Sequence, residues 1–328
     1  MNWDMLGHQW AVSLLREHVA RDRLRHAYLF TGPQGIGRRT LALRLSQAVN
    51  CLQPTEPGEP CGACRACTLI GRMQHPDLAV VQAAQSGGTL KVDQIRELQS
   101  SLSLSPYEAQ YRVALLLRFE EAHISAQNAF LKTLEEPPPR VILLVTGESP
   151  ERLLPTVVSR CEVIRLRSLP VEEVRQGMQA RWDLAADQAR LLAHLSGGRP
   201  GYALRLHQYP ELMELRRLRL EDHQRLLTCN RAQRFEYAEK LAKDKEGLPT
   251  TLQTWLSLWR DVLLCAAGST APLVNLDRAD EIARLAGRFG LRTANDMVAA
   301  LQHTSDLLEQ NVNSRLATEV LMLDLPFL

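Results

Sequence analysis

Short apolar runs that alternate with helical patterns restrict the fold of the first half of the chain more than any other feature. The runs cover Ala27–Thr31, Leu78–Val81, Arg112–Leu117 and Val141–Thr146. Between them, apolar residues recur at the spacing of amphipathic helices. Strands that are apolar throughout are buried on both faces, which happens when helices cover both sides of a parallel sheet. We therefore predict an α/β domain built on a parallel sheet.

A glycine-rich turn, GPQGIG at 32–37, follows the first predicted strand directly. This order of strand, glycine loop and helix is typical of loops whose backbone N–H groups bind phosphate. The next two positions are normally Lys, which reaches the phosphates, and Ser or Thr, which binds Mg²⁺, but here they are Arg38 and Arg39. Thr40 comes one residue late, and a helix turns by about 100° per residue, so its hydroxyl is expected to point away from a metal.

We therefore expect no Mg-dependent hydrolysis at this degenerate loop. Two alternatives remain for this loop: a weak anion site at Arg38, or a tight turn that binds no ligand. The residues concerned are Gly32, Gly35, Gly37, Arg38, Arg39 and Thr40.

Two carboxylates, Glu120 and Glu121, follow the third predicted strand. In a working phosphate-transfer site, carboxylates at such a position hold the metal and orient the attacking water. Because the glycine loop offers the metal no well-placed hydroxyl, we interpret both as vestigial or surface groups.

Four of the seven cysteines lie close together in the sequence, at Cys51, Cys61, Cys64 and Cys67. Clustered cysteines in a reducing compartment indicate a metal before they indicate disulfides. Four thiolates satisfy tetrahedral Zn²⁺ and leave no open position for catalysis. The spacing predicts a structural zinc module over 51–67, with an iron–sulfur site or unligated thiols as the alternatives.

The strand signals end near residue 168, and the remainder is helical. Breaks at Leu169-Pro170 and at 197–201 separate a small helical segment from a longer one. We predict three domains: an α/β domain at 1–168, a small helical lid at 169–207 and an all-helical domain at 208–328. An apolar stripe around Trp255 and Trp259 is interpreted as core packing.

Charge and composition exclude several classes of protein. With 45% hydrophobic residues and a formal net charge of +2, the chain is neither disordered nor basic enough to hold a polyanion by its overall field. It has no apolar run of about 18 residues and no leader-like start, so we expect a cytoplasmic protein without a membrane partner.

Two further features are ambiguous when taken alone. Arg160, in Ser159-Arg160-Cys161, reads as a helix-end arginine in a local ion pair. Glu135 and Glu136 end a predicted helix, where acidic groups oppose the helix dipole, so a partner contact and a solvated helix end are equally favoured.

Four motifs together resemble the clamp-loader subunits of bacterial DNA polymerase III, which are AAA+ proteins. They are HAYLFTG at 26–32, the cysteine window, NAFLKTLEEPP at 128–138 and LLPTVVSRC at 153–161. The likeness is dense from about Gly7 to Leu166 and faint in the C-terminal helices.

The resemblance implies an AAA+ module with a zinc-binding cysteine window, a helical lid and a C-terminal collar domain. By resemblance, Arg160 would be an arginine finger presented to ATP held by a neighbouring subunit. The implied partners are gamma/tau and delta subunits in a hetero-pentamer, with the sliding clamp and primed DNA reached through the complex. The chain would thus belong to a DNA-directed DNA polymerase holoenzyme without intrinsic activity of its own.

Two other functions are weighed against this one. Active gamma-type ATPases of the family share the cysteine window and Ser-Arg-Cys, but they keep the Lys and Thr that positions 38 and 39 lack. A zinc-bearing DNA-binding protein is the second alternative, and the nearly neutral charge argues against it.

Overall fold

Two compact units make up the chain. The computed structural model describes residues 3–85, 87–310 and 312–328. The first unit comprises Met1–Gly177 with Gly198–Tyr202, and the second comprises Met178–Gly197 with Ala203–Leu328. Within the described residues, no helix combines the length and the apolar character that a membrane crossing requires.

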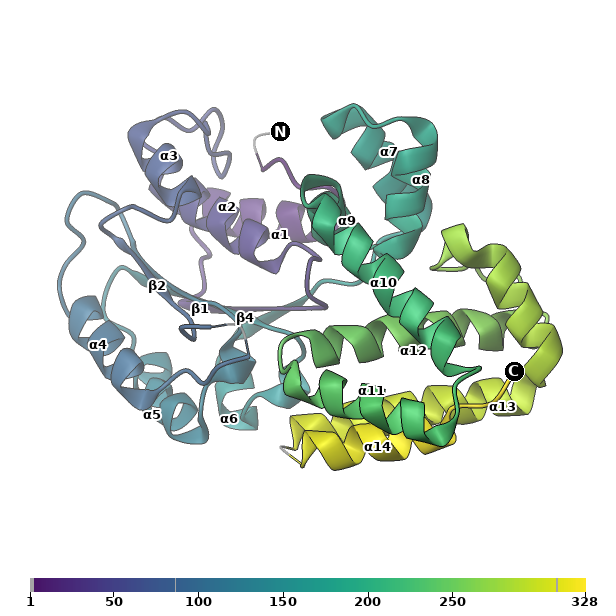
Figure 1. Cartoon of the computed structure of the whole chain (residues 1–328). Coiled ribbons are helices and arrows are strands. Elements are labelled where there is room, and N and C mark those ends of the chain that lie inside the picture. The colour runs from purple at the N-terminus through teal and green to yellow at the C-terminus, as the bar shows by residue number, and fades with distance from the viewer. Residues whose placement is uncertain (1–2, 86, 311) are drawn as a thin grey trace. The chain divides into compact units, whose positions relative to one another are not determined.

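A parallel sheet of five strands forms the centre of the first unit (Figure 1). The strands are β1 (Ala27–Thr31), β2 (Leu78–Val81), β3 (Arg112–Leu116), β4 (Val141–Gly147) and β5 (Glu162–Arg165), in the spatial order β2-β3-β4-β1-β5. The predicted α/β fold class and its four apolar strands are confirmed.

Helices cover both faces of this sheet (Figure 1). Those of the first unit are α1 (Gln9–Ala20), α2 (Arg38–Asn50), α3 (Arg65–Gly71), α4 (Val92–Leu102), α5 (Ile124–Glu135) and α6 (Pro155–Val158), with short turns η1 (Phe119–Glu121) and η2 (Pro150–Arg152). Because side chains alternate along a strand, Tyr28 and Phe30 of β1 pack into the core under α1 and α2, whereas Leu29 packs into the core with α4 and α5.

The strand β5 lies at the edge of the sheet and was not predicted. Its four residues are Glu162, Val163, Ile164 and Arg165, and only Ile164 is fully buried. A short edge strand with charged ends lacks the continuous apolar run that marks a central strand. It pairs with β1, with Tyr28 opposite Glu162, and it begins directly after Ser159-Arg160-Cys161.

The second half of the chain is helical, as predicted. The helices are α7 (Val171–Trp182), α8 (Ala186–Leu195), α9 (Pro200–Gln208), α10 (Pro210–Leu226), α11 (Arg231–Lys243), α12 (Gly247–Ala266), α13 (Ala279–Glu309) and α14 (Ser314–Asp324), with a turn η3 (Leu276–Arg278). The α13 span contains a kink at Gly290, whose φ of 70° is left-handed. Helices α7 and α9 have residues in both units, and the three-domain division at 168 and 207 stays a prediction.

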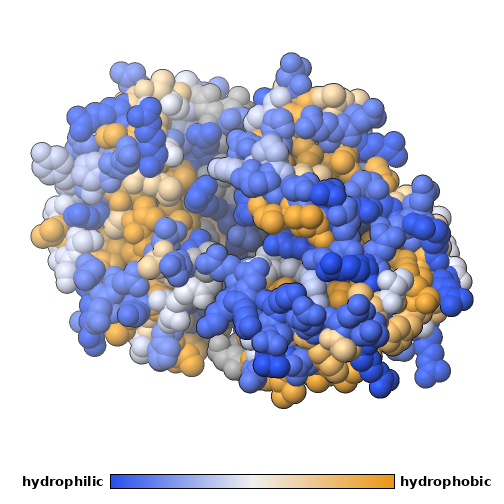
Figure 2. Space-filling view, in the orientation of Figure 1, coloured by the Kyte–Doolittle hydropathy of each residue, from blue (hydrophilic) through white to orange (hydrophobic). Residues whose placement is uncertain are grey.

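The core of the second unit is built around two tryptophans of α12. Trp255 and Trp259 are fully buried among apolar residues of α10, α11, α13 and α14, which confirms their interpretation as core. The face shown in Figure 2 carries many hydrophilic residues and several apolar patches, one of them over α14 at the lower edge of the view. On that helix Leu316, Val320 and Leu323 are exposed, whereas Leu321 and Met322 face the core.

Candidate functional site

The glycine loop, Gly32–Gly37, connects the end of β1 to the start of α2. Gly32, Gly35 and Gly37 have φ angles of 144°, 83° and 113°, which L-residues with a Cβ rarely adopt. A Cβ on Gly32 would lie 2.3 Å from the carbonyl oxygen of Leu166, so the loop also requires glycine for space. The loop therefore has the strand–turn–helix form that the sequence predicts.

Arg38 and Glu120 face each other beside the loop. Arg38 Nη1 lies 3.8 Å from Glu120 Oε1, and the two side chains are 9% and 13% exposed. Arg38 Nη1 and Glu120 Oε2 are buried without a hydrogen-bond partner among the described residues. Burial lowers the pKa of Arg38 and raises the pKa of Glu120. Two charged groups thus share a site from which most water is removed.

The other residues near this pair have different surroundings. Arg39 and Thr40 are exposed on the first turn of α2. Glu121 Oε1 accepts hydrogen bonds from Gly87 N at 3.0 Å and from Arg118 Nε at 2.9 Å. Neither Glu120 nor Glu121 is a surface group, since their side chains are 13% and 14% exposed, and only Glu120 lies against the arginine of the loop.

Two segments that sequence reasoning did not connect with the glycine loop contact it. Gly201 N, near the start of α9, donates a hydrogen bond to Gly35 O at 2.8 Å, and a Cβ on Gly35 would lie 2.8 Å from Tyr202 N. His8 Nε2 lies 3.3 Å from Ile36 O, and burial lowers the pKa of His8. The only local signal for the first contact is the glycine-rich sequence at 197–201.

The four cysteines come together in space. Cys51 follows α2, Cys61 and Cys64 lie in the next loop, and Cys67 lies in α3. Their Sγ atoms all lie within 4.8 Å of one another. Backbone N–H groups point at three of the sulfurs: Cys61 N at 3.2 Å from Cys51 Sγ, Cys64 N at 3.2 Å from Cys61 Sγ, and Cys67 N at 3.5 Å from Cys64 Sγ.

This cysteine cluster fits a tetrahedral cation. Zn–S bonds of about 2.3 Å place the sulfurs of a tetrahedron about 3.8 Å apart, and Cys51 Sγ and Cys64 Sγ are 4.0 Å apart. The N–H groups of Cys64 and Ala63 lower the pKa of Cys61 to about 6, whereas burial raises the pKa of Cys51 and Cys67. A bound cation would replace the protons of the buried thiols, so the cluster indicates a structural metal site of the zinc type.

The loop between Cys51 and Cys61 is fastened to the N-terminal part of the unit. Trp3 Nε1 donates a hydrogen bond to Gly58 O at 3.0 Å. Arg16 of α1 forms ion pairs with Glu56 at 2.7 Å and with Glu59 at 3.1 Å. These contacts fasten the loop to α1 and to Trp3 outside the cysteine cluster itself.

Arg160 lies just beyond α6, and a hydrogen bond from its Nη1 to Ser159 Oγ at 3.5 Å accompanies two shorter contacts. Its Nη2 donates to Glu135 Oε1 at 2.6 Å, and its Nη1 donates to Thr156 O at 2.9 Å. The side chains of Arg160 and Glu135 are 35% and 51% exposed. Arg160 is therefore in an ion pair, but its partner is 25 residues away in the sequence and not local as expected, and the pair accounts for one of the two acidic groups at the end of α5.

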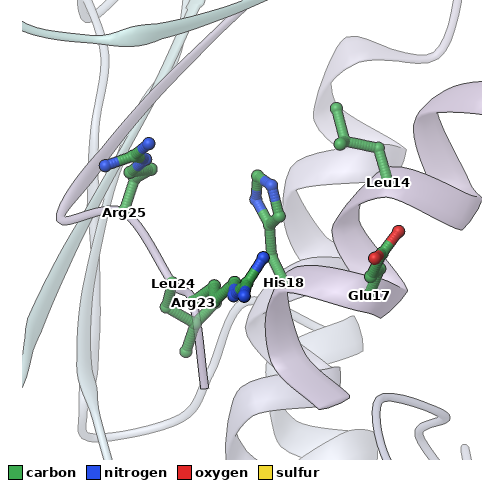
Figure 3. Close-up of a pocket in the computed structure, with 6 residues that line it drawn as sticks. All are labelled: Leu14, Glu17, His18, Arg23, Leu24 and Arg25. Carbon is green, nitrogen blue, oxygen red and sulfur yellow. The ribbon is translucent and has the colours of Figure 1, made fainter. Parts of the chain in front are cut away.

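A separate hollow of about 470 Å³ lies at the opposite end of β1 from the glycine loop (Figure 3). It is lined by Leu14, Glu17, His18, Arg23, Leu24 and Arg25. His18 Nδ1 lies 3.0 Å from the hydroxyl of Tyr28. None of the predicted site residues lines this hollow.

Comparison with known proteins identifies the family. Residues 7–170 match the family model described as "DNA polymerase III, delta subunit", and residues 210–326 match "DNA polymerase III, delta subunit, C terminal". The chain is 29% identical over 316 residues to DNA polymerase III subunit delta' of Bacillus subtilis, covering 95% of this chain and 94% of that protein. The chain belongs to the DNA polymerase III delta-prime family of clamp-loader subunits. The resemblance read from the four motifs is confirmed.

Further matches include both delta-prime and gamma/tau subunits. The chain is 37% identical over 200 residues to subunit delta' of Pseudomonas aeruginosa, covering 60% of each chain. The match to subunit tau of Escherichia coli, at 32% identity, covers 54% of this chain and 27% of that protein. A solved gamma-subunit-related protein of Thermotoga maritima is 15% identical with a TM-score of 0.49, covering 95% of this chain and 97% of that one.

The family match places the candidate residues within one delta-prime module. The region 7–170 includes the glycine loop, the cysteine cluster, Glu120, Glu135 and Arg160. The region 210–326 covers the helices from α10 to α14. The delta-prime chain is thus a subunit of the DNA polymerase III clamp loader whose candidate chemistry lies in the first region.

Proposed function

We propose that this delta-prime subunit hydrolyses no ATP itself and supplies Arg160 in trans to ATP bound by a neighbouring gamma/tau subunit. In this way it assists the loading of the sliding clamp onto primed DNA. Its proposed partners are gamma/tau and delta subunits in a hetero-pentamer. The observation that carries the proposal is the contrast between Arg38, buried against Glu120, and Arg160, which is held at the surface.

The chain's own glycine loop is unsuited to hydrolysis for two reasons. Arg39 occupies the position of the magnesium-binding hydroxyl, and a guanidinium does not ligate a hard cation. Arg38 lies against Glu120, the carboxylate best placed to help hold a metal. Removing one partner from a buried ion pair costs about 3–5 kcal/mol, so drawing Arg38 away to a phosphate opposes binding.

Arg160 has the properties that a finger acting in trans requires. Contacts to Glu135, Thr156 and Ser159 fix its guanidinium, and a guanidinium carries more N–H groups than these contacts use. Its partner Glu135 is half-exposed, so the ion pair lies at the surface, is screened by water and leaves Arg160 accessible to a phosphate. An arginine that reaches a transferring phosphoryl group accelerates hydrolysis by about 10³–10⁵.

Three structural assignments complete the proposal. The cysteine cluster would bind Zn²⁺ through Cys51, Cys61, Cys64 and Cys67, which would hold the end of α2 against α3. The proposed domains are the AAA+ module at 1–168, the lid at 169–207 and a collar at 208–328. The exposed apolar residues of α14, Leu316, Val320 and Leu323, are the surface that we assign to collar contacts.

The decisive experiment is Arg160→Ala in the clamp loader reconstituted with its gamma/tau and delta partners. We expect normal assembly and at least about a 10³-fold loss of hydrolysis at the site that Arg160 serves, seen as missing amplitude in a single-turnover ATP experiment. The matched control is Arg152→Ala, which removes another surface arginine that pairs with a glutamate, Glu148, at 2.8 Å.

Two results would contradict the proposal. The first is full single-turnover amplitude in the Arg160→Ala complex. The second is Mg-ATP turnover by the isolated chain that Glu120→Gln abolishes, which would favour the gamma-type ATPase alternative. The proposal is supported if the isolated chain does not turn over ATP and the Arg160→Ala complex is impaired in hydrolysis.

A further inference from the structure

The contact between Arg160 and Glu135 joins two elements that end at the same place. Glu135 is the last residue of α5, and Arg160 follows α6. Arg160 Nη2 donates to Glu135 Oε1 at 2.6 Å, a short charge-assisted hydrogen bond. The second anchor, Thr156 O at 2.9 Å, belongs to α6 itself. Arg160 is therefore fixed relative to α6 by one contact and relative to α5 by the other.

Helix stability does not explain the carboxylate at position 135. The carbonyl end of a helix carries partial negative charge, so an acidic side chain there opposes the helix dipole. Glu136, the next residue, is also acidic and exposed. Of the two, Glu135 is the one whose carboxylate meets a cation across a tertiary contact.

The guanidinium of Arg160 is fixed by its contacts and still has N–H groups that can bind a phosphate. Thr156 O and, at 3.5 Å, Ser159 Oγ accept from Nη1, and Glu135 accepts from Nη2, so Nε–H and the second N–H of Nη2 remain for an acceptor outside. An arginine side chain has several rotatable bonds and loses considerable rotamer freedom when it is fixed. Because Glu135 already fixes the Arg160 side chain in the folded protein, this rotamer freedom is lost on folding and not when Arg160 binds a phosphate.

We propose that Glu135 is the positioning residue for Arg160: its carboxylate orients the guanidinium so that the free N–H groups face a phosphate of the adjoining subunit. This inference rests on the proposed function, because it assumes that Arg160 acts in trans. Glu135 itself touches no reacting atom. The competing arrangement is a carboxylate that withholds Arg160 from the phosphate, and this arrangement predicts the opposite change in rate.

The test compares Glu135→Ala and Glu135→Gln in the reconstituted clamp loader, with Glu136→Ala as the matched control. We expect Glu135→Ala to lower kcat for ATP about three- to tenfold at the served site, with little change in KM, because orientation matters most in the transition state. Glu135→Gln keeps the length and an acceptor oxygen and is expected to lose less. Glu136→Ala is expected to behave as the unmodified subunit.

A double-mutant cycle separates positioning from a structural role. In an Arg160→Ala background, Glu135→Ala is expected to cause no further loss of kcat, because the group that it orients is absent. The exchange variant Glu135→Arg/Arg160→Glu provides a second check, since it can restore the ion pair without restoring the finger. We expect this variant to fold and assemble and to stay impaired in hydrolysis.

Each outcome decides between the possibilities. If Arg160→Ala has no effect, the proposed function fails. If Arg160→Ala impairs hydrolysis while Glu135→Ala is unchanged or faster, the finger stands and the positioning role is overturned. A loss that persists in the Arg160→Ala background, or a return of activity in the exchange variant, assigns Glu135 a structural role instead. Should Glu135→Ala assemble poorly, Glu135→Gln in the same cycle distinguishes positioning from a structural role.

Discussion

His223 makes the C-terminal helices sensitive to acid. Its ring is completely buried, and its Nε2 accepts a hydrogen bond from Trp259 Nε1 at 2.9 Å. The Nδ1 atom has no hydrogen-bond partner among the described residues. Burial and, to a smaller extent, the charge of Arg234 lower the pKa of His223 from 6.5 to about 3. The folded unit therefore holds this histidine neutral well below the pH at which an unfolded chain protonates it.

The stability change follows from this difference in pKa. Between the folded value of about 3 and the unfolded value of 6.5, the unfolded chain binds more protons, so the free energy of unfolding decreases as the pH falls through this window. From pH 8 to pH 5, this one group accounts for a loss of about 2 kcal/mol.

Urea unfolding followed by tryptophan fluorescence measures this loss, since Trp255 and Trp259 lie next to His223. His223→Gln removes the titration and retains an acceptor for Trp259, so the variant is expected to lose about 2 kcal/mol less than the unmodified protein between the two pH values. His303→Gln, at an exposed position of α13, is the control and is expected to leave the loss in place. Equal losses in His223→Gln and the unmodified protein would refute the reasoning.

Three further perturbations test other parts of the molecule. Cys67→Ser is expected to abolish stoichiometric zinc in elemental analysis and to lower the melting temperature, whereas the exposed Cys265→Ser retains both; zinc retained by Cys67→Ser contradicts the metal assignment. Burial acts to raise the pKa of Asp77, but N–H bonds from residues 107–109 bring it below its ordinary value. Asp77→Asn is therefore expected to lose about 1.5–3 kcal/mol of unfolding free energy at pH 7, with the gap to the unmodified protein closing as the pH falls below about 4 in urea titrations; a gap independent of pH refutes this. Leu323→Glu on α14 is expected to leave the melting temperature unchanged and to reduce assembly with gamma/tau and delta in size-exclusion chromatography, and unchanged assembly argues against that surface.

Periodicity and turn chemistry were sufficient to predict most of the fold. The runs at Ala27–Thr31 and Val141–Thr146 become central strands because every residue of a central parallel strand is buried, which leaves a continuous apolar signature. The edge strand β5 has less of that burial and two charged ends, so its sequence does not differ from that of a loop. The helix α1 ends at Ala20, where Arg21 and Asp22 turn the chain with a left-handed φ of 53° at Asp22, and no glycine or proline marks this end in the sequence.

In the candidate site, too, the features set by local sequence were predictable and those set by long-range contacts were not. The cysteine cluster was predictable because the spacing of its ligands is itself a sequence pattern, and the glycine loop because a turn between strand and helix restricts its residues. The bond from Gly201 to Gly35 and the pair of Arg160 with Glu135 join positions that no local pattern relates. The acidic pair Glu135 and Glu136 at a helix end, and the ion pair expected for Arg160, indicated that partners could exist but not which residues they were.

Arg38 and Arg160 show that burial, more than residue type, decides whether an arginine can bind a phosphate from outside. Arg38 and Arg160 each pair with one glutamate, yet the first pair is 9% and 13% exposed and the second 35% and 51%. Moving Arg38 away from Glu120 would leave a buried carboxylate without a partner, which costs about 3–5 kcal/mol of free energy. Taking Arg160 from Glu135 exposes the carboxylate to water and costs at most about 1 kcal/mol. A phosphate carrying several negative charges can therefore approach Arg160 while it stays beside Glu135, whereas Arg38 is enclosed with Glu120, and this difference is the physical reason for the proposed trans role of Arg160.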